Sequence, residues 1–182
     1  AGSGLGFAPR SVPLGLYDVL CGRAAAAEVV LKTELGGLDL LPSTQALAAI
    51  EIELVDAPNR EYRLKEAIAP LREKYDYLLI DCPPSLGLLT INALAAADSV
   101  VVPVQCEYYA LEGLGHLMQT LDRVKEGVNP GLRVEGVLLT MFDPRNNLAR
   151  EVVDEVRGHF DRVFATVIPR NVRLSEAPSF GK

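Results

Sequence analysis

Four short polar segments, each directly after an apolar run, could carry the chemistry of this chain. The most informative contains Asp81, which follows the apolar residues 78–80. An apolar strand that delivers a carboxylate to the edge of a sheet is the Walker B arrangement, in which the acid helps to hold a nucleotide-bound Mg²⁺. The same pattern also fits an ordinary aspartate in a turn. A phosphoacceptor aspartate of a receiver domain is a third interpretation, but the flanking acidic pair and the lysine of such domains are not evident.

The other three polar segments follow later apolar runs and comprise residues 103–105, 140–143 and 169–171. In an open α/β sheet, ligands bind outside the carboxyl ends of the parallel strands. All four segments are therefore candidates for a ligand site, provided that the runs before them are strands of one sheet.

The elements that must position these segments can be read from the alternation of apolar runs and helical spacing. Short apolar runs bounded by proline, glycine or charge predict strands, and longer stretches with apolar residues at helical spacing predict helices. Strands separated by helices imply right-handed crossovers and a parallel, doubly wound α/β sheet in one domain. The strands are expected at 38–41, 75–80, 99–102, 134–141 and 163–168, and the helices at 44–55, 60–74, 88–97, 109–128 and 148–160.

The composition is that of an ordinary globular protein. Of the 182 residues, 49% are hydrophobic and 23% are charged, and no apolar stretch reaches the ~18 residues that span a bilayer. Residues 1–10 lack the layout of an export signal. Cys21, Cys82 and Cys106 lack metal-site spacing, so reduced cytosolic thiols are the simplest interpretation. The net charge of −6 argues against a nucleic-acid-coated protein, although the arginines between residues 145 and 173 offer a local basic patch.

Several strings of this sequence, in the same order, closely resemble the ParA/Soj family of chromosome- or plasmid-partitioning ATPases, a deviant Walker class of P-loop NTPases. The strings cover residues 75–94, 102–113, 135–141 and 167–178, and the resemblance extends over residues 2–182. It implies a single ParA-like (AAA-31/CbiA-like) P-loop NTPase domain over residues 1–182, truncated at both ends. It also implies a cytoplasmic, nucleoid-associated Mg²⁺- and ATP-dependent homodimer without a membrane contact. Such a dimer binds double-stranded DNA without sequence preference and is discharged by a ParB/Spo0J-like partner.

The resemblance also assigns roles to individual residues. Asp81 matches the catalytic Walker B acid that orders the Mg²⁺ shell through water. Arg145 and Arg173 match arginines associated with DNA binding on the dimer surface, although a solvated surface arginine is the simpler interpretation of each when taken alone. The residues that match segments lining the nucleotide base are Thr140, Met141, Pro169, Arg170 and Asn171.

The family's phosphate-binding loop has no counterpart in this sequence. No G-x-x-x-x-G-K-S/T string occurs, so the backbone cradle and the lysine that neutralise the nucleotide phosphates are not supplied by these residues. We therefore expect the chain by itself neither to hydrolyse ATP nor to fold robustly, as an incomplete gene product or a truncated piece of an active ATPase would behave. Two alternatives remain: a non-catalytic remnant that binds DNA or a partner, and a division-site-positioning or metal-cluster-assembly ATPase of the same class. The cluster-assembly version is disfavoured because no Cys-x-x-Cys pair is present.

Overall fold

The computed structural model describes residues 2–7, 12–83 and 85–177. The chain divides into two compact units, the first comprising Ala1–Ala96 with Arg173–Lys182 and the second comprising Ala97–Val172. Each unit has its own buried residues, and each is described in turn.

The first unit is mainly helical, with one small sheet. Strands β1 (Leu31–Lys32) and β2 (Asp39–Leu40) pair antiparallel. Its 3-10 helices are η1 (Gly2–Leu5), η2 (Gln45–Ala49), η3 (Arg60–Tyr62) and η4 (Ala69–Leu71). Its α-helices are α1 (Leu16–Leu20), α2 (Ala26–Val29), α3 (Ile50–Glu53), α4 (Arg63–Ile68) and α5 (Leu88–Ala96), while α8 (Val172–Glu176) begins at the last residue of the second unit.

Apolar side chains at helical spacing form the core of the first unit. Leu64 and Ile68 on α4 and Ala93 and Ala96 on α5 pack in one cluster with Ile50 of α3. The helix predicted over 60–74 is confirmed, and it is broken as expected near Pro70, since α4 ends at Ile68 and the chain continues as η4. The helix predicted over 88–97 is α5.

The strand predicted over 75–80 is wrong for this structure. The segment forms no strand, and the side chains of Tyr77 and Leu79 are 84% and 91% exposed. Leu78 and Ile80 point the other way and pack against the core. The Tyr75 hydroxyl donates a hydrogen bond of 2.6 Å to Asp39 on β2. The segment thus contacts the core of the first unit through one of its sides only. No strand among the described residues pairs with it, and a strand exists only as part of a hydrogen-bonded ladder.

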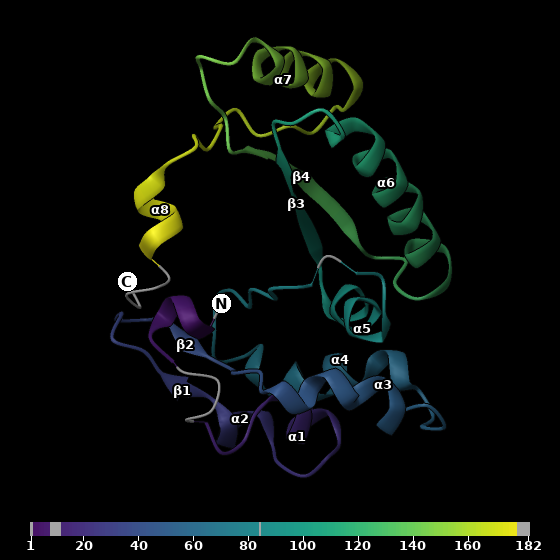
Figure 1. The fold of residues 1–182 in the computed structure, drawn as a ribbon. Helices are drawn as coiled ribbons and strands as arrows, with labels where there is room; N and C mark the ends of the chain where they lie inside the picture. Colours follow the sequence, from purple (N-terminus) through teal and green to yellow (C-terminus); the bar gives the residue numbers. More distant parts are fainter. Residues whose placement is uncertain (1, 8–11, 84, 178–182) are drawn as a thin grey trace. The chain divides into compact units, whose positions relative to one another are not determined.

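The second unit contains the parallel sheet. Strands β3 (Ser99–Gln105) and β4 (Arg133–Thr140) pair in parallel, with α6 (Ala110–Gly127) as the crossover and α7 (Asn147–His159) after β4 (Figure 1). These elements confirm the predicted strands and helices. The prediction that the first strand ends at Pro103 is wrong, because β3 continues through Pro103, which lies opposite Leu138 in the register. Proline is tolerated in an edge strand when its nitrogen faces away from the neighbouring strand.

A third segment runs parallel to β4 on the side opposite β3. It is joined through isolated bridges, Val137 to Val163 and Phe142 to Pro169, rather than through a continuous ladder. The predicted strand over 163–168 is therefore present only as an irregular edge. Both units together give an α/β fold whose longer strands are parallel, as predicted. Within the part of the chain that the structure describes, no helix is long and apolar enough to cross a bilayer.

Candidate functional site

The carboxyl ends of three parallel segments meet at one edge of the second unit. The Cys106 N–H, just after β3, donates to the Thr140 carbonyl at 3.0 Å. The Phe142 N–H donates to the Ile168 carbonyl at 3.1 Å, and the Arg170 N–H donates back to the Phe142 carbonyl at 2.9 Å. The structure thus brings together two segments that the sequence analysis singled out separately, residues 140–143 and 169–171.

The turn after β4 is made by a residue in an uncommon backbone conformation. Met141 has φ +56°, in the left-handed region that residues other than glycine rarely adopt. The Thr140 hydroxyl before it donates to the Val104 carbonyl at 3.3 Å, which ties the end of β4 to β3. Residues held in sparsely populated backbone regions cluster at ligand sites because the surrounding structure determines them. Met141 and Thr140 therefore remain good candidates for contacts to a ligand at this edge.

Arg170 extends over this edge from the third segment. Its Nη2 donates to the Glu107 carboxylate at 3.1 Å, which links two loops that are 63 residues apart in the sequence. Both side chains are about half exposed. Arg170 therefore remains accessible to solvent, and the two side chains place opposite charges beside this strand-end edge. Asn171 is the next residue, and its side chain is also exposed.

The loop after Met141 holds a second arginine–carboxylate pair. The Arg145 guanidinium donates from Nε and Nη2 to Asp143 at 3.0 and 2.8 Å. Its backbone N–H donates to the same carboxylate at 3.0 Å. These hydrogen bonds, with Arg170 adding a smaller electrostatic contribution, lower the pKa of the Asp143 carboxyl to about 2. Arg145 therefore carries a carboxylate partner that the sequence analysis missed.

Asp81 and Arg173 belong to the first unit. Asp81 is exposed and follows residues 75–80. Arg173 is exposed on the short helix α8. Arg145 and the five residues that the sequence analysis expects to line a nucleotide base belong to the second unit. The structure therefore collects these five residues in one unit, and it assigns Asp81 and Arg173 to the other.

The residues present fit one part of a Mg²⁺-nucleotide site. No group of three His, Cys, Asp or Glu side chains able to hold a metal occurs among the described residues. Mg²⁺ does not need such a cage, because it is commonly held by one or two carboxylates together with phosphate oxygens and water. An exposed carboxylate at Asp81 fits that role.

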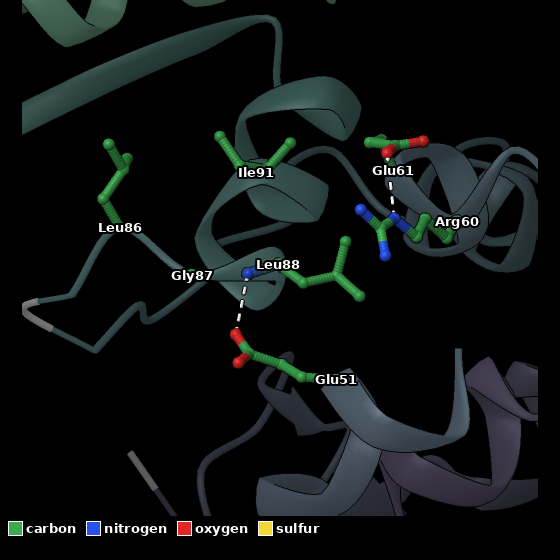
Figure 2. A pocket seen from close by; sticks show the side chains of 7 residues that line it. All are labelled: Glu51, Arg60, Glu61, Leu86, Gly87, Leu88 and Ile91. Carbon is green, nitrogen blue, oxygen red and sulfur yellow. Dashed lines mark hydrogen bonds and ion pairs between the residues drawn. The ribbon is translucent and has the colours of Figure 1, made fainter. Parts of the chain in front are cut away.

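The first unit contains a further feature that the sequence analysis did not identify. A hollow of about 410 Å³ lies at the start of α5, and its lining includes Glu51, Arg60, Gly87 and Leu88 (Figure 2). The Glu51 carboxylate accepts a hydrogen bond of 2.9 Å from the Leu88 N–H and so caps α5. A Cβ added at Gly87 would collide with this carboxylate. Glu51 is exposed to solvent, but its carboxylate has a specific structural role as the cap of α5.

Asn92 on α5 is a second missed residue. Its side chain is 2% exposed and makes hydrogen bonds to three backbone groups. Oδ1 accepts from the Leu64 N–H at 3.0 Å, and Nδ2 donates to the Arg60 and Leu88 carbonyls at 2.9 and 3.0 Å. A lone amide within a helix that is apolar apart from Thr90 was the signal that could have identified it, because a buried polar side chain needs partners.

Comparisons with known proteins agree over the whole chain. A family model described as an AAA domain (AAA_31) matches residues 1–134. The chain is 57% identical to the chromosome partitioning protein ParA of Myxococcus xanthus, over 100% of this chain and 65% of that protein. It is 55% identical to the sporulation initiation inhibitor protein Soj of Bacillus subtilis, over 100% of this chain and 72% of that protein. The chain thus spans about two thirds of the length of these relatives.

A solved structure has a closely similar fold. The crystal structure of cobyrinic acid a,c-diamide synthase from Mycobacterium smegmatis, with bound ATP analog and magnesium, matches with a TM-score of 0.86 and 39% identity. The match covers 92% of this chain and 67% of that chain. The α/β fold with a parallel sheet is therefore that of a known class of nucleotide-binding proteins.

Proposed function

The chain belongs to the ParA/Soj family of chromosome-partitioning ATPases, and we propose that the protein carrying it partitions a chromosome or plasmid by an ATP-dependent cycle. In this cycle, binding of ATP and Mg²⁺ favours a homodimer that holds DNA without sequence preference, and hydrolysis releases it. A ParB/Spo0J-like partner stimulates the hydrolysis, and the protein acts in the cytoplasm on the nucleoid. The observation that carries the proposal is the identity along the entire chain, 57% to a chromosome partitioning protein ParA and 55% to a Soj protein.

The strand ends of the second unit would hold the nucleotide base. Thr140 and Met141 are joined to Pro169 and Arg170 through the hydrogen bonds that Phe142 makes. Backbone groups at strand ends, together with an amide side chain such as that of Asn171, can recognise the edge of an adenine ring. This edge has both.

Asp81, in the first unit, would act on the nucleotide phosphates through Mg²⁺. Its carboxylate would order water around Mg²⁺, and the metal would supply charge neutralisation at the phosphates when bound. The sequence contains no glycine-rich loop followed by lysine. We therefore expect the 182-residue chain alone to bind Mg-ATP weakly and not to hydrolyse it.

Arg145 and Arg173 would contact the DNA backbone. Both side chains are exposed, and arginine contacts phosphate oxygens without reading base sequence. Each phosphate contact contributes to a salt-dependent affinity. We expect Arg145→Ala and Arg173→Ala to weaken DNA binding on every duplex to a similar extent.

The proposal is tested by titrating a fluorescent ATP analogue with Mg²⁺ into the full-length protein and, separately, into the 182-residue chain. We expect saturable binding by the full-length protein and much weaker binding by the chain. Asp81→Asn in the full-length protein should reduce ATP hydrolysis strongly, and Asp76→Asn, at an exposed aspartate five residues earlier, should not. If the 182-residue chain binds the analogue about as tightly as the full-length protein, this account of the nucleotide site is wrong. Other residues of the chain would then hold the phosphates of the nucleotide.

A further inference from the structure

The loop between β4 and α7 contains an aspartate and an arginine that bind each other. Asp143 and Arg145 are two residues apart, and three hydrogen bonds join them, two of them from the guanidinium. The Asn146 N–H also donates to the Asp143 carbonyl at 3.0 Å, which closes a turn around Pro144. The Arg145 side chain is 88% exposed, whereas that of Asp143 is 24% exposed. The carboxylate is thus fixed in the turn while the guanidinium extends into solvent.

This contact occupies the part of Arg145 that a phosphate would use. A guanidinium presents two parallel N–H groups to a carboxylate or to a phosphate in the same forked geometry. Asp143 takes the edge formed by Nε and Nη2. A phosphate that approaches Arg145 meets either the remaining N–H groups or the negative charge of Asp143, and in both cases the attraction is smaller than for an unpaired arginine.

Arg150, on α7 just after this loop, provides a contrast. Its Nη2 hydrogen-bonds the Pro144 carbonyl, which is a neutral acceptor. Arg150 therefore keeps its full charge toward solvent. Of these two arginines, Arg145 is the one whose forked edge is taken by a carboxylate.

We propose that Asp143 restrains DNA binding by competing with backbone phosphates for the guanidinium of Arg145. This inference rests on the proposed function, because it assumes that Arg145 contacts DNA. In this arrangement a phosphate gains Arg145 only by displacing the carboxylate of the same loop. The affinity of each subunit for DNA is consequently lower than the number of its arginines implies, and release of DNA is easier.

The experiment measures binding of the full-length protein, with ATP and Mg²⁺, to a fluorescein-labelled duplex of random sequence over a range of salt concentrations. Asp143→Asn removes the charge and keeps the Oδ1 atom that accepts from the Arg145 N–H, so the turn is retained. The matched control is Glu151→Gln, because Glu151 is an exposed carboxylate on α7 and the change in net charge is the same. The remaining variants are Arg145→Ala and the double variant Asp143→Asn with Arg145→Ala.

We expect Asp143→Asn to tighten binding about twofold to fivefold beyond Glu151→Gln, the range that exposed ion pairs usually span. The slope of log affinity against log salt should steepen by up to about 0.9, the increment of one phosphate contact. The double variant should bind like Arg145→Ala alone, because the effect of Asp143 passes through Arg145.

Two kinds of failure can be told apart. If Arg145→Ala weakens binding but Asp143→Asn binds no tighter than Glu151→Gln, the restraint is refuted and the DNA contact stands. Weaker binding by Asp143→Asn would also overturn the inference, because Asp143 would then orient Arg145 for DNA instead of competing for it. If Arg145→Ala leaves binding unchanged at every salt concentration, Arg145 is not part of the DNA site and this part of the proposed function fails as well.

Discussion

Residues 99–105 and 75–81 are both apolar runs that end in polar residues, yet they have different structures. The first run is β3, which pairs with β4 at seven positions and buries Val102 and Val104. The second run is extended and anchored on one side, and it leaves Tyr77 and Leu79 in solvent. Hydrophobicity alone therefore does not make a strand. A neighbour that completes the hydrogen-bonded ladder is also required: β3 has β4, and residues 75–81 have no such neighbour among the described residues.

The largest expected effect tests this contrast directly. Leu139 on β4 is 0% exposed, so Leu139→Ala should lower the free energy of unfolding of the 182-residue chain by about 2–5 kcal/mol, as removal of a buried leucine does. Leu79→Ala, at a side chain in solvent, should change it by less than about 0.5 kcal/mol. Urea denaturation followed by circular dichroism measures both. Equal losses would mean that residues 75–81 are as well packed as β4.

The buried side-chain amide of Asn92 stabilises the first unit, whereas the hydrogen-bonded ladder of β3 and β4 stabilises the second. Asn92→Ala would leave the Leu64 N–H and the Arg60 carbonyl without the partner that Asn92 gives them, at a cost of about 1–3 kcal/mol. The matched control is Asn147→Ala, at an exposed asparagine in the first turn of α7, for which we expect a much smaller loss. The same denaturation experiment applies. If Asn92→Ala leaves the free energy of unfolding unchanged, these hydrogen bonds do not hold α5 to η3 and α4.

The smallest expected effect concerns the ion pair of Asp143 and Arg145 in the second unit. This pair is more exposed than the buried Asn92 amide of the first unit. The pKa of Asp143 is about 2, below the ordinary value of 3.8, so its contribution to stability is complete above the ordinary value. That contribution is lost as the pH falls from 3.8 through about 2. NMR titration of the Asp143 carboxyl carbon measures this pKa.

The Asp143 titration has a control at a neighbouring arginine on α7. Arg145→Ala should raise the pKa of Asp143 toward its ordinary value, because the Arg145 guanidinium is the main cause of the lowered pKa. Arg150→Ala should leave it low, because Arg150 bonds a carbonyl rather than the carboxylate. An unchanged pKa in Arg145→Ala would place the cause of the shift elsewhere in the loop.

Local patterns were the reliable part of the sequence prediction. Helical spacing identified α4, α5, α6 and α7 within a few residues, and the break at Pro70 followed from the missing N–H of proline. The runs before Pro103 and around Leu139 predicted β3 and β4. The prediction was poorer for residues 75–80, because strand formation depends on a partner segment rather than on the run itself.

The sequence determined the types of the candidate site residues and their positions after apolar runs, and the strings around them identified the family. The tertiary structure alone decided which of them become neighbours. Arg170 meets Glu107 across 63 residues, and Asn92 reaches Leu64 across 28. Such pairings depend on where the sheet and helices bring distant loops together, and a sequence pattern does not encode that distance. Even for Asp143 and Arg145, which are only two residues apart in sequence, the forked contact required the turn that aims both side chains at one another.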